Sequence, residues 1–219
     1  MKRLLKLIKE NRSLLLFLSL MLVFRSAVAD WNHVPTGSMQ PTIIEGDRLL
    51  VNKMAYDLRI PFTHIPIVKL ADPQRGDIII FDSKASDKKL VKRVIGLPND
   101  AISMQDNVLS INGKALTYSP LNAETAATHT EDLLGINHQI KVAGISGQGV
   151  TTRQSSFGPI NVPEDHYLVL GDNRDRSSDS RMIGFVPRAE IVGRSQQVVF
   201  SANYDNYYLP RKERFFHPL

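Results

Sequence analysis

Seven residues at positions 90–96, LVKRVIG, decide the fold class. They have no 3.6-residue period, and as an extended chain they place Leu90, Lys92 and Val94 on one face of a strand. Five further short apolar stretches separated by Gly, Pro, Asp and Asn have the same character: DRLLVNKM (47–54), DIIIF (77–81), VLSING (108–113), HYLVL (166–170) and QQVVF (196–200). The sequence therefore predicts a mainly β protein.

The segment between residues 115 and 160 has a different composition. It is rich in Thr, Ala, Gly, Ser and His and has few apolar runs, which is typical of an inserted loop region or a small subdomain. Just before it, the pair Asn112 and Gly113 stands between apolar segments, a strong signal for a hairpin turn. We therefore expect one β domain that is interrupted by an inserted subdomain at about residues 105–162.

Composition and charge limit the classes of partner. The chain has 219 residues, 42% of them apolar, enough for one sizeable core or a core with a small satellite domain. Its formal charge of +5 resides in residues 1–25, which hold six basic residues and one acidic residue; the remainder carries 21 of each. A neutral remainder argues against nucleic acid as a partner. The chain has no cysteine, which excludes disulfides, thiolate zinc sites and cysteine nucleophiles.

The N-terminal region carries the apolar run SLLLFLSLMLVF at residues 13–24, directly after the basic stretch. Because Lys and Arg resist translocation, the run predicts a membrane anchor with its N-terminus in the cytoplasm and the rest of the chain outside. A full span needs ~20 residues, reached only by counting through to Trp31 or by letting Lys9 and Arg12 snorkel. The residues AVA at 27–29 also fit the cleavage site of a signal peptide, and this alternative stays open.

Ser38, in the stretch PTGSMQPTI (35–43), is a candidate nucleophile. A serine needs a base to take its proton, but none of the six histidines lies in a recognisable triad motif. Lys92 can be that base if burial among apolar neighbours keeps its amine neutral, whereas the guanidinium of Arg93 does not lose its proton. Taken alone, Lys92 fits a solvated strand edge better, because lysines are rarely buried.

The stretch GDNRDRSSDSR at residues 171–181 follows a predicted strand and has no apolar side chain. Its three aspartates, three arginines and three serines predict a tight loop of charge-assisted pairs that positions another group, although a solvated polar turn fits as well. A calcium loop is unsuitable because Arg174 and Arg176 stand where oxygen ligands are needed. We expect neither a metal nor a cofactor.

Five blocks, in order along the chain, resemble those of the type I signal peptidases. This is the bacterial leader peptidase family of membrane-bound serine proteases with a Ser-Lys dyad. The blocks are PTGSMQPTI (35–43), GDRLLVNK (46–53), RGDIIIF (75–81), VKRVIGLPND (91–100) and GDNRDRSSDSR (171–181). Each block alone is a weak match, whereas five in the family's order are a strong one. The stretch VGRSQQVVF (192–200) is similar to the family's closing strand.

The resemblance implies a role for each matched residue. It makes Ser38 the nucleophile and Lys92 the general base, with Ser177 orienting the lysine amine. Thr36 would donate a side-chain hydrogen bond to the oxyanion beside the backbone N–H of Ser38; a donor of this kind contributes ~3 kcal/mol in hydrolases.

The resemblance also implies how the loop and the substrate are held. Asp179 and Arg181 would form an ion pair that holds the loop. The substrate would lie extended beside a strand edge, with small side chains before the cut in shallow apolar pockets. These pockets would be built partly by Val34, Pro35, Met39, Ile43 and Val91.

The family fold is a signal-peptidase-like or LexA-like β catalytic domain with an inserted subdomain, here short. The family often has two N-terminal membrane spans, whereas this sequence offers one candidate, so we expect one N-terminal membrane helix. Residues 1–31 are expected to be the cytoplasmic N-terminus and single-span anchor, and residues 32–219 the extracytoplasmic catalytic domain. The expected location is the bacterial inner membrane. The expected partners are the signal peptides of preproteins and the lipid bilayer, and we expect a monomer.

Three other functions fit parts of the same sequence. A specialised processing peptidase of the same superfamily, acting on a pilin or a secretion-system substrate, shares every motif. A cytosolic self-cleaving regulator with a Ser-Lys dyad is disfavoured by the apolar N-terminus. A non-enzymatic, membrane-tethered β-domain that binds peptides requires Ser38 and Lys92 to lie far apart. The distance between their Oγ and Nζ atoms, expected at ~3 Å for a working base, separates this last possibility from an enzyme.

Overall fold

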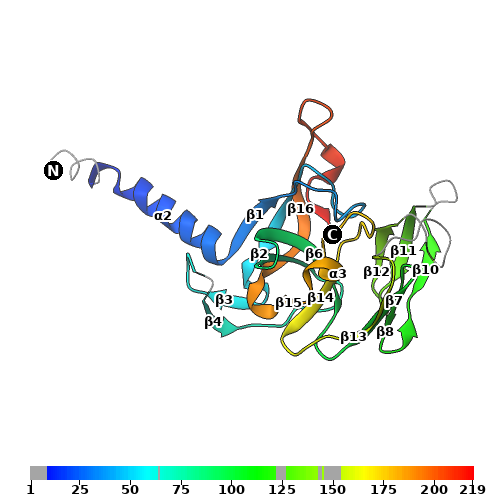
Figure 1. The fold of residues 1–219 in the computed structure, drawn as a ribbon. Helices are drawn as coiled ribbons and strands as arrows, with labels where there is room; N and C mark the ends of the chain where they lie inside the picture. Colours follow the sequence, from blue (N-terminus) through cyan, green and yellow to red (C-terminus); the bar gives the residue numbers. More distant parts are fainter. Residues whose placement is uncertain (1–8, 64, 122–126, 143–144, 146–153) are drawn as a thin grey trace.

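A computed structural model describes residues 9–63, 65–121, 127–142, 145 and 154–219. Residues 1–8 of the expected anchor, and parts of the expected insertion, lie outside these ranges. Helix α2 (Arg12–Ala27) stands away from the body of the molecule, on the side opposite strands β7–β12 (Figure 1). Among the described residues, the rest of the regular structure is β-sheet with a few short helical turns, as the sequence predicts.

The largest sheet carries the elements that form the site. All its strands pair antiparallel. Their order is β1 (Ala29–His33), β2 (Asp47–Asn52), β16 (Ile191–Asn203), β5 (Ile78–Ser83), β6 (Lys88–Gly96), β14 (His166–Leu170) and β15 (Val186–Pro187). Two short strands, β17 (Leu209–Pro210) and β18 (His217–Pro218), also pair with β16. The strands predicted from 47–54, 77–81, 90–96, 166–170 and 196–200 all belong to this sheet.

Two smaller sheets form the inserted part. One has the order β13 (Phe157–Asn161), β7 (Ala101–Gln105), β8 (Val108–Ile111) and β9 (Lys114–Ala115), and the other β10 (Thr117–Pro120), β11 (Thr128–Asp132) and β12 (Asn137–Lys141). Asn112 and Gly113 form the predicted turn between β8 and β9, with φ of 53° and 81°. The first strand of the inserted part, β7, starts at Ala101, slightly before the expected residue 105. The two sheets share a core that includes Ile102, Leu109 and Leu133.

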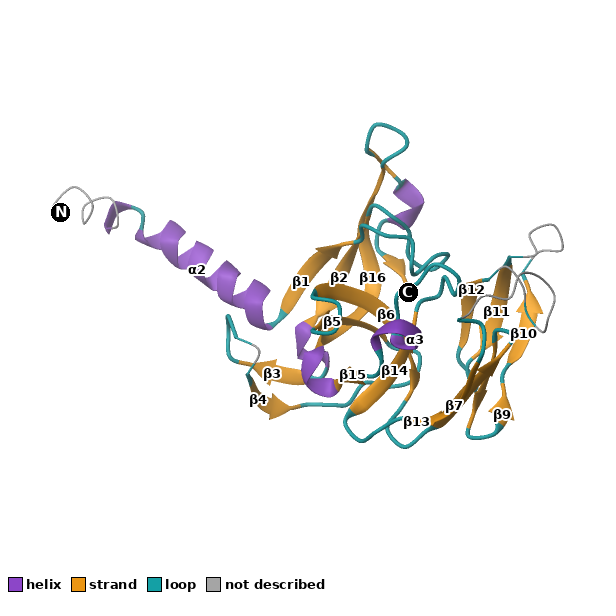
Figure 2. Cartoon of the chain, in the orientation of Figure 1, coloured by secondary structure: helices purple, strands orange, loops and turns teal. Residues whose placement is uncertain are grey.

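The remaining elements lie at the edges of the main sheet. Strands β3 (Asp57–Arg59) and β4 (Pro66–Lys69) form a separate two-stranded hairpin. The short helical elements are α3 (Ser180–Ile183), η1 (Lys53–Ala55), η2 (Arg188–Glu190) and η3 (Lys212–Arg214), and helices are coloured separately from strands in Figure 2.

Apolar alternation fixes the strands that flank the site. Along β2, Asp47, Leu49 and Val51 are buried and the residues between them are exposed, the pattern of a strand with one face on a core. Leu49 packs in a cluster with Met39 and Ile43 from the segment that carries Ser38. The nucleophile segment is therefore attached to the sheet by its own apolar side chains.

Helix α2 ends earlier than the anchor expected from the sequence, which extended to residue 31. Trp31 and its neighbours belong to β1, and Ala29 already pairs with Asn52 of β2, so the helix ends at Ala27 with 16 residues. Trp31 is therefore unavailable to lengthen a span, because strand pairing takes the backbone at Ala29. Among the described residues, no helix is both long and apolar enough to cross a membrane. The AVA stretch lies at this junction of helix and strand.

Candidate active site

A tight turn presents Ser38 beside the main sheet. The backbone N–H of Gln40 donates to the carbonyl of Gly37 at 3.1 Å, and that of Ile43 donates to the carbonyl of Met39 at 2.9 Å. Met39 and Ile43 are 1% and 0% exposed, so the turn is anchored on both sides of its hydrogen bonds. Ser38 itself is half-buried, which leaves its hydroxyl open to a ligand on one side.

Lys92 on β6 lies against this serine. Its Nζ is 2.9 Å from Ser38 Oγ and donates a second hydrogen bond to the carbonyl of Val91 at 2.9 Å. The side chain is buried, and burial lowers the pKa of Lys92 to about 8, although Asp179 and Asp172 oppose the shift. A lysine with that pKa has a substantial neutral fraction near pH 8, as a general base requires.

Arg93, the next residue of β6, joins the strand to the polar loop 171–181. Its Nε and Nη2 atoms donate to the two carboxylate oxygens of Asp172 at 2.8 and 2.7 Å. Thr42 Oγ1 donates to the same carboxylate at 2.5 Å. Burial raises the pKa of Asp172, but Arg93, His138 and Thr42 lower it below its usual range, so Asp172 stays ionised. The nucleophile turn, the lysine strand and the loop thus meet at one carboxylate.

Asn173 fixes the backbone on both sides of the Gly37–Ser38 peptide. Its backbone N–H donates to the carbonyl of Ser38 at 3.1 Å, and its Nδ2 donates to the carbonyl of Gly37 at 3.0 Å. These bonds set the direction of the Ser38 N–H, the group that an oxyanion would approach. Asn173 does not stand out in the sequence; its only signal is its place in the GDNRDRSSDSR loop.

Asp179 and Arg181 form the ion pair expected from the sequence. Arg181 Nε and Nη2 donate to the two carboxylate oxygens at 2.8 Å each, and the Arg181 guanidinium also reaches the carbonyl of Arg174 at 2.6 Å. Asp179 accepts a further bond from the backbone N–H of Gly171 at 3.0 Å. The pair therefore ties both ends of the loop together.

Ser177 is buried in this loop but makes no hydrogen bond to the Lys92 amine. Its hydroxyl lies so close to Gly171 that a Cβ at position 171 would be 2.2 Å from Ser177 Oγ and 2.4 Å from the Ser38 carbonyl oxygen. Glycine is thus required at 171 because the loop, the serine turn and Ser177 approach one another there. The structure places Ser177 near the nucleophile turn, without the bond to lysine that the sequence analysis expects.

A groove with a volume of about 440 Å³ opens beside the Ser38–Lys92 pair. One wall is the segment 32–36, which includes Thr36, and the other is the first half of β6. Its lining contains all five expected substrate-binding residues, namely Val34, Pro35, Met39, Ile43 and Val91. All five of these residues carry apolar side chains, so this part of the groove suits small apolar groups.

A buried ion pair joins the inserted part to the catalytic loop. Arg174 donates to both carboxylate oxygens of Glu131 on β11, at 2.8 and 2.7 Å, and the two residues are 1% and 0% exposed. Beside it, backbone bonds link Lys141 of β12 to Asp172 and Arg174, each at 2.8 Å. Glu131 is not recognisable from the sequence, because nothing local distinguishes it from a surface glutamate.

The Ser38–Lys92 pair and the groove beside it indicate one class of reaction. A serine hydroxyl in contact with a buried lysine amine, at the edge of an apolar groove, has the geometry of a hydrolase that acts by nucleophilic attack. Within the described ranges, no group of three His, Asp or Glu side chains gathers as a metal site would require.

Comparison with known proteins gives the family. The family described as "Signal peptidase, peptidase S26" matches residues 5–200. A signal peptidase I from Pseudomonas fluorescens is 34% identical over 212 residues, which cover 89% of this chain and 73% of that protein. One from Rickettsia typhi is 35% identical over 211 residues, covering 88% and 80%. The chain belongs to the signal peptidase family S26, and it is a serine endopeptidase.

The chain is also similar to the protein in a crystal structure of a signal peptidase I from Enterococcus faecalis, with 31% sequence identity. The match covers 57% of this chain and 98% of the chain in that structure, with a TM-score of 0.37.

Proposed function

We propose that this chain is a membrane-bound serine endopeptidase that cleaves signal peptides from exported preproteins, with Ser38 as nucleophile and Lys92 as general base. The observation that carries the proposal is the 2.9 Å contact between Ser38 Oγ and a buried Lys92 Nζ. A peptide-binding domain without catalysis has no need to bury an amine beside a hydroxyl, because burial of the amine costs free energy.

The substrate enters as an extended strand. Strand β6 pairs with β14 only from Arg93 onwards, so among the described strands the edge of residues 88–92 opposite β5 has no partner. This edge faces the segment 32–36 across the groove. A preprotein pairs there by main-chain hydrogen bonds, and small side chains before the cut fill the apolar lining.

The reaction starts with proton transfer from Ser38 Oγ to the neutral Lys92 amine, while Oγ attacks the carbonyl carbon of the last residue of the signal peptide. The oxyanion accepts hydrogen bonds from the Thr36 hydroxyl and the Ser38 N–H. Lys92 then gives its proton to the leaving amine, which releases the mature protein. Water, deprotonated by Lys92, hydrolyses the acyl-enzyme and restores Ser38.

The supporting residues keep this geometry before substrate binds. Asn173 orients the Ser38 peptide, and the Asp179–Arg181 pair closes the loop. Ser177 is the proposed partner of the lysine amine during the reaction. Its buried hydroxyl lies beside Gly171, at the point where the loop meets the carbonyl of Ser38.

The proposed location is the bacterial inner membrane, with the N-terminal residues as far as the end of α2 at Ala27 as anchor and the body from Ala29 onwards as the extracytoplasmic catalytic domain. The apolar side chains of α2 support this, because Leu14, Leu16, Phe17 and Leu22 are all between 54% and 61% exposed. Apolar exposure of this extent on an isolated helix fits lipid better than water. Signal peptides and the bilayer are the proposed partners of a monomeric enzyme.

The test is cleavage of a small preprotein by the detergent-solubilised chain, with the masses of product and enzyme determined. We expect wild type to release the mature protein, Ser38→Ala to leave the preprotein intact, and Ser178→Ala, on the exposed serine of the same loop, to cleave as wild type does. Cleavage by Ser38→Ala would contradict the proposal. A panel of preproteins separates a general enzyme from one that processes a single pilin or secretion-system substrate.

A further inference from the structure

The groove at the active site has two chemically different ends. Near the reactive serine and lysine its lining is mostly apolar, whereas its far end is formed by Asn32 and His33 on one wall and by Lys88 and Lys89 on the other. The lining contains no aspartate or glutamate, so the far end carries net positive charge. Pockets for small apolar side chains do not account for this charge.

The two ends are separated along β6. Lys88 and Lys92 are four residues apart on this strand, and an extended chain rises ~3.3 Å per residue, so their backbones lie ~13 Å apart. A substrate strand that pairs with the free edge of β6 advances by the same rise. Side chains four to six residues before the cut therefore lie at the far end of the groove.

The charge of the two lysines is available to a ligand, because both side chains are exposed. Lys89 Nζ lies 3.8 Å from a carboxylate oxygen of Asp82, and these side chains are 45% and 40% exposed, so solvent weakens the pair. Lys88 has no acidic partner among the described residues. Successive residues of a strand point to opposite faces, so the two amines approach a substrate strand from both sides.

We propose that Lys88 and Lys89 form a cationic subsite that accepts an acidic side chain four to six residues before the cut. A carboxylate in this position gains charge-assisted contacts, whereas both amines repel a lysine or an arginine. The preferred substrates are thus preproteins that combine an acidic residue at this position with small residues nearer the cut. The proposal rests on the proposed function, because it concerns the substrate of the same groove.

The subsite also helps to fix the register of the substrate. Because side chains alternate along a strand, a slip by one residue would place the small side chains on the wrong face. A carboxylate held at the far end and small side chains held near Ser38 fix the extended chain at two points. The two contacts together select the carbonyl that lies at Ser38 Oγ.

The test is kcat/KM for peptides in which the fourth, fifth or sixth residue before the cut is Glu, Gln or Lys. The full chain is assayed in a non-ionic detergent at low ionic strength and at pH 9, where Lys92, with a pKa of about 8, is mostly neutral. In at least one of the three positions we expect kcat/KM to be about 5- to 10-fold higher with Glu than with Lys, and Gln to lie between them. Salt at about 0.5 M should reduce this ratio towards one, because it screens exposed charges. The same three residues at the third position after the cut should show no such order.

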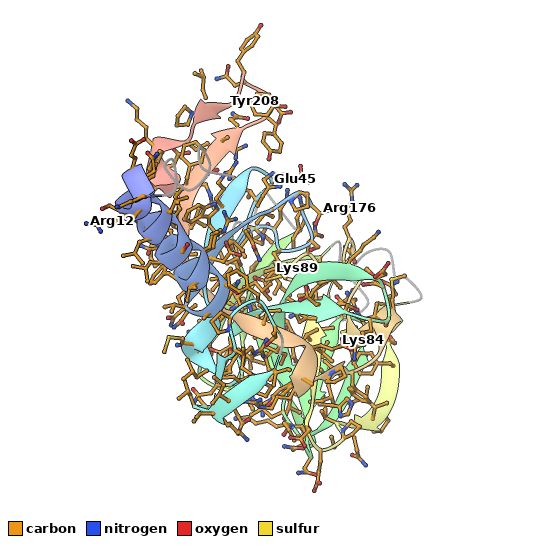
Figure 3. The ribbon with its side chains drawn as sticks, turned by 90° about the vertical axis from the view of Figure 1, so that its left-hand side faces the viewer. Arg12, Glu45, Lys84, Lys89, Arg176 and Tyr208 are labelled. Atoms are coloured by element: carbon orange, nitrogen blue, oxygen red, sulfur yellow. The ribbon has the colours of Figure 1, made fainter. Side chains whose placement is uncertain are left out.

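Charge-reversal variants assign the preference to the two lysines. In a chain that carries both Lys88→Glu and Lys89→Glu, the order should reverse, so that the Lys peptide becomes the better substrate. A chain with Lys88→Gln and Lys89→Gln should bring the ratio close to one. The matched control is Lys84→Glu, which should keep the wild-type order. Lys84 is exposed in the turn between β5 and β6, outside the groove lining, and Figure 3 labels it together with Lys89.

The outcomes keep the subsite and the proposed function apart. Peptides are compared within each variant, so a general loss of activity does not alter their order. If wild type cleaves all the peptides equally well and Ser38→Ala cleaves none, the catalytic assignment stands and the cationic subsite is wrong. The subsite is also wrong if the two double variants keep the wild-type order, or if Lys84→Glu reverses it as well. If wild type cleaves no peptide, or Ser38→Ala cleaves as wild type does, the proposed function fails and the subsite with it.

Discussion

Lys92 shows how a single residue obtains its chemistry from its surroundings. Burial lowers its pKa to about 8, while Asp179 and Asp172 act in the opposite direction. Each of these carboxylates is held by its own arginine, Asp172 by Arg93 and Asp179 by Arg181. Because the arginines offset most of the negative charge near the amine, burial prevails and the lysine becomes a usable base.

The first prediction concerns pH. Only neutral Lys92 accepts the serine proton, so kcat/KM should rise with pH, reach half of its maximum near pH 8 and then level off. Below that pH, each further unit should lower kcat/KM roughly tenfold. The measurement is a pH profile with a peptide substrate that has no group titrating between pH 5 and 10. A profile that stays flat down to pH 5 would contradict the assignment of Lys92.

The second prediction concerns Asn173. Asn173→Ala removes the bond to the Gly37 carbonyl, so the Ser38 N–H loses part of its alignment with the oxyanion. We expect kcat to fall on the order of 10- to 100-fold with little change in KM, because the residue lines no part of the groove. The matched control is Arg176→Ala, an exposed position on the same loop that Figure 3 shows projecting from the surface. An equal loss of kcat in both variants would show that the loop, and not the amide, is responsible.

At the scale of elements, β6 and the 171–181 loop form the site together. Strand β6 supplies Lys92, Arg93 and one wall of the groove. The loop is held from the other side by β12, through the backbone bonds of Lys141, and by β11, through Glu131. The inserted part is thus a support for the catalytic loop, attached to it by main-chain pairing and one buried ion pair.

The third prediction tests that support. Burial raises the pKa of Glu131, but Arg174 and His138 lower it below its usual range, so the pair remains ionised at neutral pH. Glu131→Gln leaves Arg174 buried without a counter-charge, which should lower the free energy of unfolding by about 3–5 kcal/mol and reduce kcat. Urea unfolding and cleavage assays measure the two effects.

The control for Glu131 is the exposed ion pair of Lys69 with Asp72, whose side chains are 57% and 51% exposed. Lys69→Gln should change the free energy of unfolding by less than about 1 kcal/mol, because solvent screens such pairs. A double variant, Glu131→Met with Arg174→Met, should recover most of the lost stability. If Glu131→Gln proved as stable as Lys69→Gln, the buried pair would not be the support that we describe.

At the scale of the whole molecule, α2 and the body are nearly independent. Along α2 only Ala27 is buried, whereas β1 pairs with β2 over its five residues. The helix therefore adds little to the core, and the first strand of the body begins at Ala29. The site lies entirely within the body, with Ser38 only nine residues beyond that point.

The fourth prediction follows from this division. A chain that begins at Arg25 should fold, keep its thermal midpoint within about 3 °C of the full chain and cleave a soluble peptide, because it retains β1 and the Lys53 bonds to the end of α2. A chain that begins at Val34 lacks β1 and should be clearly less stable. Circular dichroism melts and peptide cleavage measure both. Equal melting of the two truncated chains would show that β1 contributes nothing to the fold.

The sequence alone determined six of the strands, the Asn112–Gly113 turn and the identity of Ser38 and Lys92 as candidates. These depend on local signals, namely alternation along a strand, turn residues and ordered motifs, all of which are legible without a partner segment. The tertiary structure decided what depends on distant residues. It places Lys92 Nζ 2.9 Å from Ser38 Oγ across 54 positions of sequence.

The same reason explains what the sequence did not show. Asn173 and Glu131 act through residues 136 and 43 positions away, and no local pattern encodes such a contact. The helix α2 ends at Ala27 because the next residues pair with β2, which hydropathy alone does not reveal. Local physics fixes what each segment prefers to be. Packing decides which segments meet, and burial at that meeting point turns an ordinary lysine into a base.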